Sequence, residues 1–396
     1  MLGLIVLGMV LLTIGGGFWW YYNDGDLDEV QQHAKEHGLP TTWAKLRGTV
    51  SDENRIRIWE RITKVGSALG SYQDSESFRP RSVQFSIWDP PSQALLDHHA
   101  SLDAGQVKEL ASLLDQLGDE PLILHEVMTY RTLLPETGVK RDLIRFMQER
   151  LLIADKTDVG DWARRMLACC RSISPDSLML NLVRISLIEI TLTGIAKRMP
   201  DLKLEYPKIS QDILKTIGDP HHNTVRSLHG EYLMMFETLS QNRAHTEYGE
   251  AKGTWFMPVI LRAGRAPVLI GYLDDVQHFQ LLDPNTAVTW GAGKDAELQA
   301  ARSGRITPQL FIRGIYQPAW HALARNNVSI GMHGRLIAAE MLGKPWPIDG
   351  FDPTGAVLRP IMRDGRVIAA YSVGTDGIDQ SGADKVDRVF PLYAKP

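Results

Sequence analysis

Cysteine, an excess of one charge and the motifs of common enzymes are all scarce in this sequence of 396 residues. Its two cysteines, Cys169 and Cys170, are too few for a disulfide framework or a cysteine-based zinc cluster. The 43 basic residues nearly balance the 47 acidic ones, so we expect no nucleic-acid partner. Hydrophobic residues make up 44% of the chain, which excludes a protein that is disordered throughout and allows a substantial core.

Signatures of catalysis are missing as well. The chain has no Gly-x-Ser-x-Gly nucleophile motif and no Gly-x-x-x-x-Gly-Lys-Ser/Thr phosphate loop. His222 and His229 share one face of a predicted helix, but zinc-binding helices place their histidines four residues apart. The sequence therefore assigns no catalytic or cofactor-binding residue and favours a protein that is not an enzyme.

The first 22 residues predict a membrane anchor. Leu2–Tyr22 contains no charged residue, and its 21 residues would form a helix of about 31 Å, enough to cross a bilayer. The segment ends in five aromatic residues, Phe18–Tyr22, which are typical of the membrane interface. An aromatic block stands where a signal peptide would have small residues for cleavage, so we favour an uncleaved anchor over a cleaved signal or a buried helix. The acidic flank favours a single-pass protein with its body outside the cytoplasm.

Residues 23–343 predict a helical body. Leu178–Ala196 is its most apolar stretch, but Arg184 and Glu189 near the middle favour a buried central helix over a second membrane span. Pro121–Leu134 is predicted as a further helix. Gly249–Thr307 contains many turn-forming residues and predicts only short helical pieces.

Residues 344–396 predict a small antiparallel sheet. Two strands, Ala356–Met362 and Arg366–Tyr371, flank an Asp-Gly pair that is typical of a hairpin turn, and Val386–Leu392 forms a third strand. The predicted fold is therefore mainly α, with an N-terminal transmembrane helix (1–22), a multi-helix body (23–343) and a small C-terminal antiparallel β module (344–396).

An acidic, glycine-rich loop separates the second and third strands. It spans 372–387 and carries four carboxylates, those of Asp376, Asp379, Asp384 and Asp387. Calcium prefers six to eight oxygen ligands, and glycines allow backbone carbonyls to converge on an ion. The loop lacks the spacing of an EF-hand, and a plain solvated turn is the alternative to a calcium site.

The last 50 or so residues resemble the C-terminal module of the major pseudopilins of type II secretion systems. The resemblance is carried by the run 346–355, the two strands that follow, and the element Tyr371-Ser-Val-Gly-Thr-Asp-Gly377. The same tail is similar to that of many membrane-anchored bacterial envelope proteins. In the family this loop binds calcium, and the resemblance implies that Ser372, Asp376 and Asp387 match the family's loop. Asp379 and Asp384 are additional carboxylates of the same loop.

Three functions remain open on these grounds. We favour a membrane-anchored, non-catalytic protein that binds or scaffolds a protein partner outside the cytoplasm and holds calcium in its C-terminal loop. The alternatives are an extracytoplasmic hydrolase with a site between helices and a subunit of a secretion or pilus system. Residues 1–22 contain no Glu, which pseudopilins need for filament assembly, and this absence counts against the last alternative.

Overall fold

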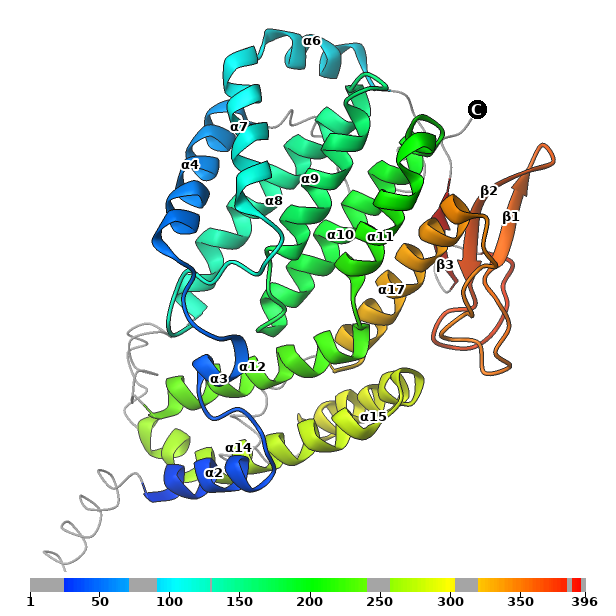
Figure 1. Cartoon of the computed structure of the whole chain (residues 1–396). Helices are drawn as coiled ribbons and strands as arrows, with labels where there is room; N and C mark the ends of the chain where they lie inside the picture. Colours follow the sequence, from blue (N-terminus) through cyan, green and yellow to red (C-terminus); the bar gives the residue numbers. More distant parts are fainter. Residues whose placement is uncertain are drawn as a thin grey trace, which may run out of the picture.

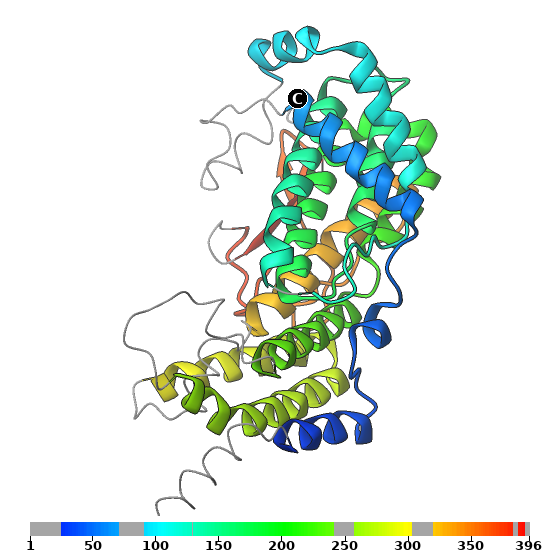
Figure 2. The same ribbon diagram turned by 90° about the vertical axis from the view of Figure 1, so that its left-hand side faces the viewer.

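The computed structural model describes residues 25–70, 91–128, 130–240, 257–302, 320–382 and 387–392, so the predicted anchor lies outside the described residues. The described chain is mainly helical and ends in a small antiparallel sheet, as predicted. The helices form a tall upper bundle and a lower layer that crosses beneath it (Figures 1 and 2).

The upper bundle consists mostly of long, nearly parallel or antiparallel helices, with the short helix α6 at its far end (Figure 1). Its helices are α4 (Glu53–Leu69), α6 (Gln93–Ser101), α7 (Ala104–Leu117), α8 (Tyr130–Ile153), α9 (Val159–Arg171), α10 (Leu178–Arg198), the 3₁₀ helix η1 (Met199–Glu205) and α11 (Tyr206–Ile217). Polar side chains mark several starts, since Asp52, Asp103 and Ser177 each accept a hydrogen bond from the first turn that follows.

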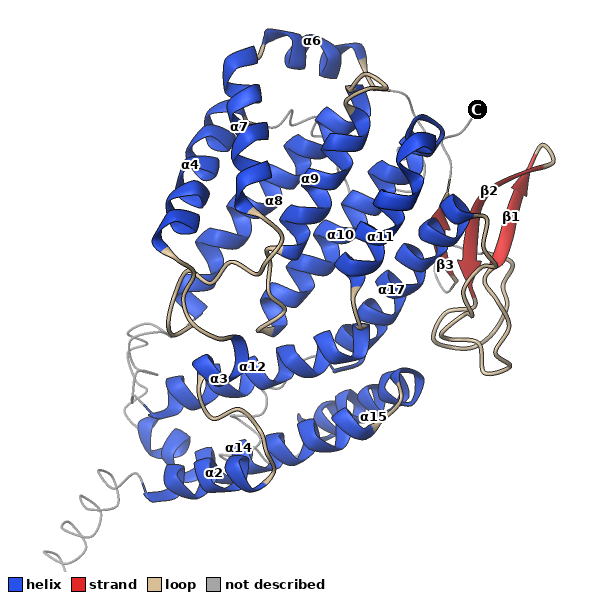
Figure 3. Ribbon diagram, viewed as in Figure 1, coloured by secondary structure: helices blue, strands red, loops and turns tan. Residues whose placement is uncertain are grey.

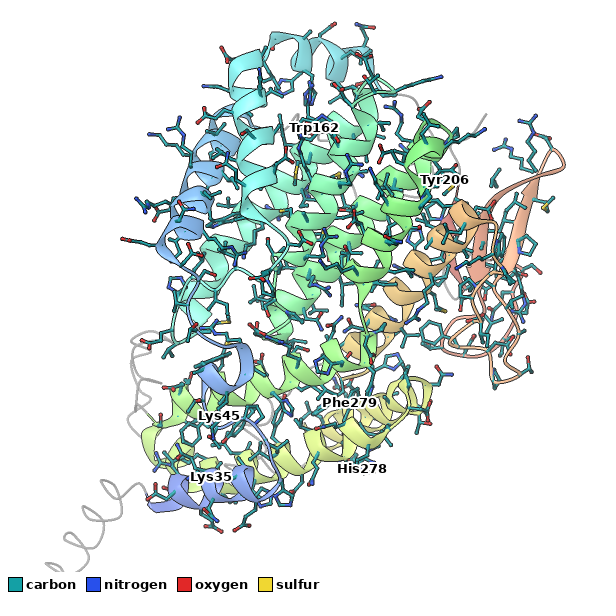
Figure 4. All side chains as sticks on the ribbon, viewed as in Figure 1. Lys35, Lys45, Trp162, Tyr206, His278 and Phe279 are labelled. Atoms are coloured by element: carbon teal, nitrogen blue, oxygen red, sulfur yellow. The ribbon has the colours of Figure 1, made fainter. Side chains whose placement is uncertain are left out.

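The lower layer lies at the opposite end of the molecule from α6. It contains α2 (Gly25–Glu36), α3 (Trp43–Arg47), α12 (Pro220–Ser240), α14 (Met257–Leu281) and α15 (Pro284–Arg302). Helix α17 (Trp320–Leu342) joins the two parts, because it packs against α10 and α11 above and against α12 and α15 below. Figure 4 places Trp162 in the upper bundle and Phe279 in the lower layer, and both side chains are buried.

Helix α10 confirms the prediction of a buried central helix. It packs against α8, α9, α12 and α17. Arg184 is buried and donates a hydrogen bond to the backbone carbonyl of Thr216, so its charged group has a partner inside the protein. Among the described residues, one stretch within Leu178–Ser240 is long and apolar enough to cross a membrane, but 61% of its most apolar window is buried inside the protein.

Two predictions about helices are wrong. Residues 121–128 are not helical; Leu122 donates its backbone N–H to the carbonyl of Ser172, and the helix begins only at Tyr130. Within Gly249–Thr307 the structure shows two long helices, α14 and α15, in place of short pieces. Pro267 lies inside α14, where its exposed side chain and the packing of α14 on α12 and α2 make it tolerable.

The C-terminal module is a three-stranded antiparallel sheet in the order β1-β2-β3, drawn in red in Figure 3. Its strands are β1 (Arg359–Arg363), β2 (Arg366–Ser372) and β3 (Arg388–Pro391). The predicted two-residue turn joins β1 to β2, and Asp364 and Gly365 both have positive φ, at 50° and 74°. The module lies beside α17, and Phe390 and Leu392 at its inner edge are fully buried.

Candidate functional site

A buried carboxylate, Asp349, organises the start of the acidic loop. It has no solvent exposure, and it accepts hydrogen bonds from Ser372 Oγ at 2.6 Å, from the backbone N–H of Val373 at 2.9 Å and from that of Phe351 at 3.0 Å. The Ser372 hydroxyl, which was predicted as a metal ligand, therefore donates a hydrogen bond to the Asp349 carboxylate. Ser372 Oγ also accepts from the backbone N–H of Gly374 at 3.2 Å.

Arg359 of β1 binds three carboxylates, two from the turn that precedes the strand and one from the acidic loop. Its guanidinium lies 2.6 Å from Asp352 Oδ2, 3.0 Å from Asp379 Oδ2 and 3.4 Å from Asp349 Oδ2. Hydrogen bonds from Thr354 and Arg359 hold the pKa of Asp352 at about 2. Asp379 also accepts a hydrogen bond from the Tyr371 hydroxyl at 3.1 Å, so this predicted ligand belongs to the arginine network.

Asp376 and Asp387 lie on either side of Gln380. The Asp376 carboxylate accepts from the Ile378 backbone N–H at 3.1 Å and from Gln380 Nε2 at 2.9 Å. Asp387 Oδ2 accepts from the backbone N–H groups of Gln380, at 3.1 Å, and of Gly382, at 2.7 Å. These bonds connect Asp376 and Asp387, which come from the two halves of the loop, to the same glutamine in its middle.

Among the described residues of the loop, two oxygen atoms are buried without a hydrogen-bond donor. They are Asp387 Oδ1 and Gln380 Oε1, and the side chain of Asp387 is only 4% exposed. A buried carboxylate oxygen without a partner is costly, and a bound cation would satisfy it. Both atoms are hard oxygen donors of the type that calcium selects.

The remaining predicted ligand, Asp384, lies outside the described residues. Within the described ranges, no group of three or more His, Cys, Asp or Glu side chains converges in a way that could hold a metal ion. The described part of the loop therefore supplies one carboxylate and one amide oxygen, and further ligands would have to come from Asp376, Asp384, backbone carbonyls or water.

Other chemically interesting groups are dispersed over the body. His99 Nε2 lies 3.0 Å from Glu149 Oε2 in a buried pair between α6 and α8. A cavity of about 280 Å³ lies between α4 and α8, where Thr63, Ser67 and Asp142 are its polar lining residues, so the histidine pair and the cavity are separate places.

Both cysteines are buried free thiols. Burial raises the pKa of Cys169 to about 12 and that of Cys170 to about 11, so both remain protonated at neutral pH. His229 is a half-buried helical histidine, and burial together with the nearby His222 lowers its pKa to about 4.

Comparison of the chain with protein families, with curated proteins and with solved structures finds no match.

Proposed function

We propose that this is a membrane-tethered, non-catalytic envelope protein whose helical body is held in a fixed position relative to its anchor and carries a calcium-stabilised C-terminal module. The anchor is the apolar segment 1–22, and the body lies outside the cytoplasm. The observation that carries the proposal is the ion pair between Asp26 and Arg265, close to the end of the anchor.

This ion pair fixes the helix that follows the anchor. Arg265 is 1% exposed; its Nε lies 2.7 Å from Asp26 Oδ2 and its Nη2 lies 2.6 Å from Asp26 Oδ1. The same guanidinium donates to the Leu239 carbonyl at 3.2 Å, and so connects α2, α12 and α14. Bidentate arginine–carboxylate pairs are geometrically strict, so the first turn of α2 is held rigidly.

A second contact fixes the same helix further along. His33 Nε2 lies 2.8 Å from Asp274 Oδ1. Asp26 and His33 are seven residues apart and so lie on one face of α2, the face that packs on α14. A helix held at both ends cannot act as a loose linker. This arrangement suits a scaffold that presents a surface at a set orientation to the membrane.

Exposed apolar side chains on the C-terminal module support a protein partner. Ile348 and Val357 face each other in an antiparallel bridge and are 64% and 52% exposed. Ile378 in the acidic loop is 60% exposed. Apolar side chains exposed as neighbours are typical of protein-binding surfaces.

The calcium site would use Asp387 Oδ1 and Gln380 Oε1, the two buried oxygens that have no donor. Calcium there would neutralise the Asp387 carboxylate and connect the middle of the loop with its C-terminal end. It would stabilise the module without any catalytic role, in agreement with the resemblance to the pseudopilin module.

Calorimetry tests the calcium site. We expect the full chain in detergent micelles to bind one Ca²⁺ with measurable heat and the Asp387→Asn variant to lose that heat. Asp364→Asn changes an exposed aspartate of the same module and is expected to bind as the unaltered chain does. A folded chain that gives no heat, or equal binding by Asp387→Asn, would contradict the proposal.

A further inference from the structure

Two histidines lie one helical turn apart at the C-terminal end of α2. His33 belongs to the last turn of the helix, and His37 directly follows its final residue. The backbone N–H of His37 donates to the carbonyl of His33 at 3.2 Å, so the helical turn continues through both residues. The centres of the two imidazole rings are 4.2 Å apart. A separation of four residues is the one that zinc-binding helices use for their two histidines.

A carboxylate from the neighbouring helix meets this pair. Asp274 of α14 lies with its Oδ1 2.8 Å from Nε2 of His33. Helices α2 and α14 run in the same direction, because Asp26 contacts Arg265 at one end and His33 contacts Asp274 further along both helices. Two imidazoles and one carboxylate from two packed helices are a set of ligands that suits zinc and related divalent transition metals.

A hydrogen bond leaves one nitrogen of His37 available as a ligand. Its Nδ1 lies 2.8 Å from the carbonyl oxygen of His33. Since a carbonyl only accepts, Nδ1 carries the proton, and Nε2 of the neutral ring keeps its lone pair. Histidines that bind metals commonly donate their other ring N–H to a backbone carbonyl or a carboxylate, which fixes the tautomer.

The contact between His33 and Asp274 has room for an ion after a small movement. The carboxylate accepts a hydrogen bond from Nε2, and a metal ion placed between them would replace that proton. The proton can move to Nδ1 through solvent, because the His33 side chain is 23% exposed. Tetrahedral zinc, with ligand distances of about 2.0–2.1 Å, places two ligand atoms about 3.3 Å apart. The two atoms, now 2.8 Å apart, would therefore separate only slightly.

The partial exposure of all three side chains allows them to turn toward one ion. As they stand, the described side chains do not surround a common point. The Asp274 side chain is 56% exposed and His37 is half-buried, so both can rotate without disturbing the core. Water can supply the fourth ligand at such an open site.

We propose that His33, His37 and Asp274 bind one divalent transition-metal ion, such as zinc, and that this ion fastens the C-terminal end of α2 to α14. The labelled Lys35 marks this turn of α2 in Figure 4. The site differs in chemistry from the acidic loop, because imidazole nitrogens suit zinc whereas calcium selects oxygen ligands.

Calorimetry with zinc tests the site. The full chain is titrated in detergent micelles with calcium in excess, so that the acidic loop does not compete for zinc. We expect one Zn²⁺ to bind. Loss of an outer-shell partner weakens metal binding about 10–100-fold, so His37→Gln, which removes a direct ligand, should weaken it by about tenfold or more.

This variant should keep the fold. The hydrogen bond and the ring contact of the His37 side chain are both with His33 of its own turn. His222→Gln, which alters an exposed histidine of α12, is the matched control and should bind zinc as the unaltered chain does.

Hydrogen exchange shows whether the ion fastens the helix. We expect zinc to slow the exchange of the α2 amides, residues 25–36, and to leave those of α4 in the upper bundle unchanged. A folded chain that binds no zinc, equal binding by His37→Gln, or binding that leaves the exchange of α2 unchanged would overturn the proposal.

Discussion

Arg265 and Asp26 are 239 residues apart in sequence, yet their side chains form two hydrogen bonds of 2.6 and 2.7 Å in the lower layer. The guanidinium is buried, whereas the carboxylate is one-third exposed. The pair connects the first described helix of the chain to α14, so the segment that follows the predicted anchor is part of the folded body.

Loss of this carboxylate should destabilise the fold. In Asp26→Asn the buried Arg265 keeps its charge but loses its bidentate partner. Breaking a fully buried pair costs about 3–5 kcal/mol, and the partial exposure of Asp26 reduces the expected loss to about 2 kcal/mol. Urea unfolding of the full chain measures the free energy of unfolding. Asp28→Asn, an exposed change on the same helix, should stay within about 0.5 kcal/mol of the unaltered chain. Equal stability of the two variants would contradict a structural role for the pair.

Gly230 should tolerate no side chain. A Cβ atom there would lie 1.4 Å from the carbonyl oxygen of Asp176, because α12 crosses the segment before α10 at very close range. We expect Gly230→Ala to lower the free energy of unfolding by about 3 kcal/mol or more, or to prevent folding. Gly271 of α14 is exposed, with nothing within 4 Å of its Cβ position, so Gly271→Ala should stabilise the protein by about 0.5–1 kcal/mol. Thermal unfolding of both variants measures the two opposite changes in stability. A small loss of stability in Gly230→Ala would contradict the close contact between α12 and the segment before α10.

Acid should weaken the C-terminal module through two carboxylates. Hydrogen bonds from Thr354 and Arg359 hold the pKa of Asp352 at about 2, below its ordinary value of 3.8. Burial opposes ionisation of Glu189, but His333 and Arg388 bring its pKa to about 2, below 4.5. A depressed pKa adds stability above the unfolded value, and that stability is lost as the pH falls. Urea unfolding between pH 6 and pH 2 should show this loss from about pH 4.5 to pH 2. In Asp352→Asn and in Glu189→Gln, the free energy of unfolding should fall less steeply with falling pH than in the unaltered chain. An unchanged pH dependence in both variants would contradict the role of these two carboxylates.

Much of the architecture follows from local patterns in the sequence. The apolar stretch Leu178–Ala196 predicts a central helix, and α10 covers it. The Asp364-Gly365 pair predicts the hairpin turn, because these residue types accept the positive φ that a two-residue hairpin requires. The prediction of short helical pieces in place of α14 and α15 failed because tertiary packing, and not the local sequence, decides these helices. Proline and glycine suggest turns locally, but packing on α2, α12 and α17 outweighs that preference.

The site could be predicted only in part. The sequence identifies Asp387 as an acidic loop residue. Its buried Oδ1 without a hydrogen-bond donor makes it the best candidate ligand, and that feature depends on the folded loop. The role of Asp349 was not predicted, because its bond to Ser372 joins residues 23 positions apart. Its place in the run 346–355, which carries the resemblance to the pseudopilin module, was the available signal.

Labelling from outside the membrane shows whether the body is tethered and extracytoplasmic, as we propose. Cys169 and Cys170 are buried with raised pKa values, so the unaltered chain should resist thiol reagents and an introduced cysteine should react alone. Asp364→Cys places that cysteine at the exposed hairpin turn. Intact spheroplasts that express this variant are treated with a membrane-impermeant maleimide. We expect full labelling before lysis, with all labelled protein in the membrane fraction. Labelling that requires lysis, or labelled protein in the soluble fraction, would contradict it.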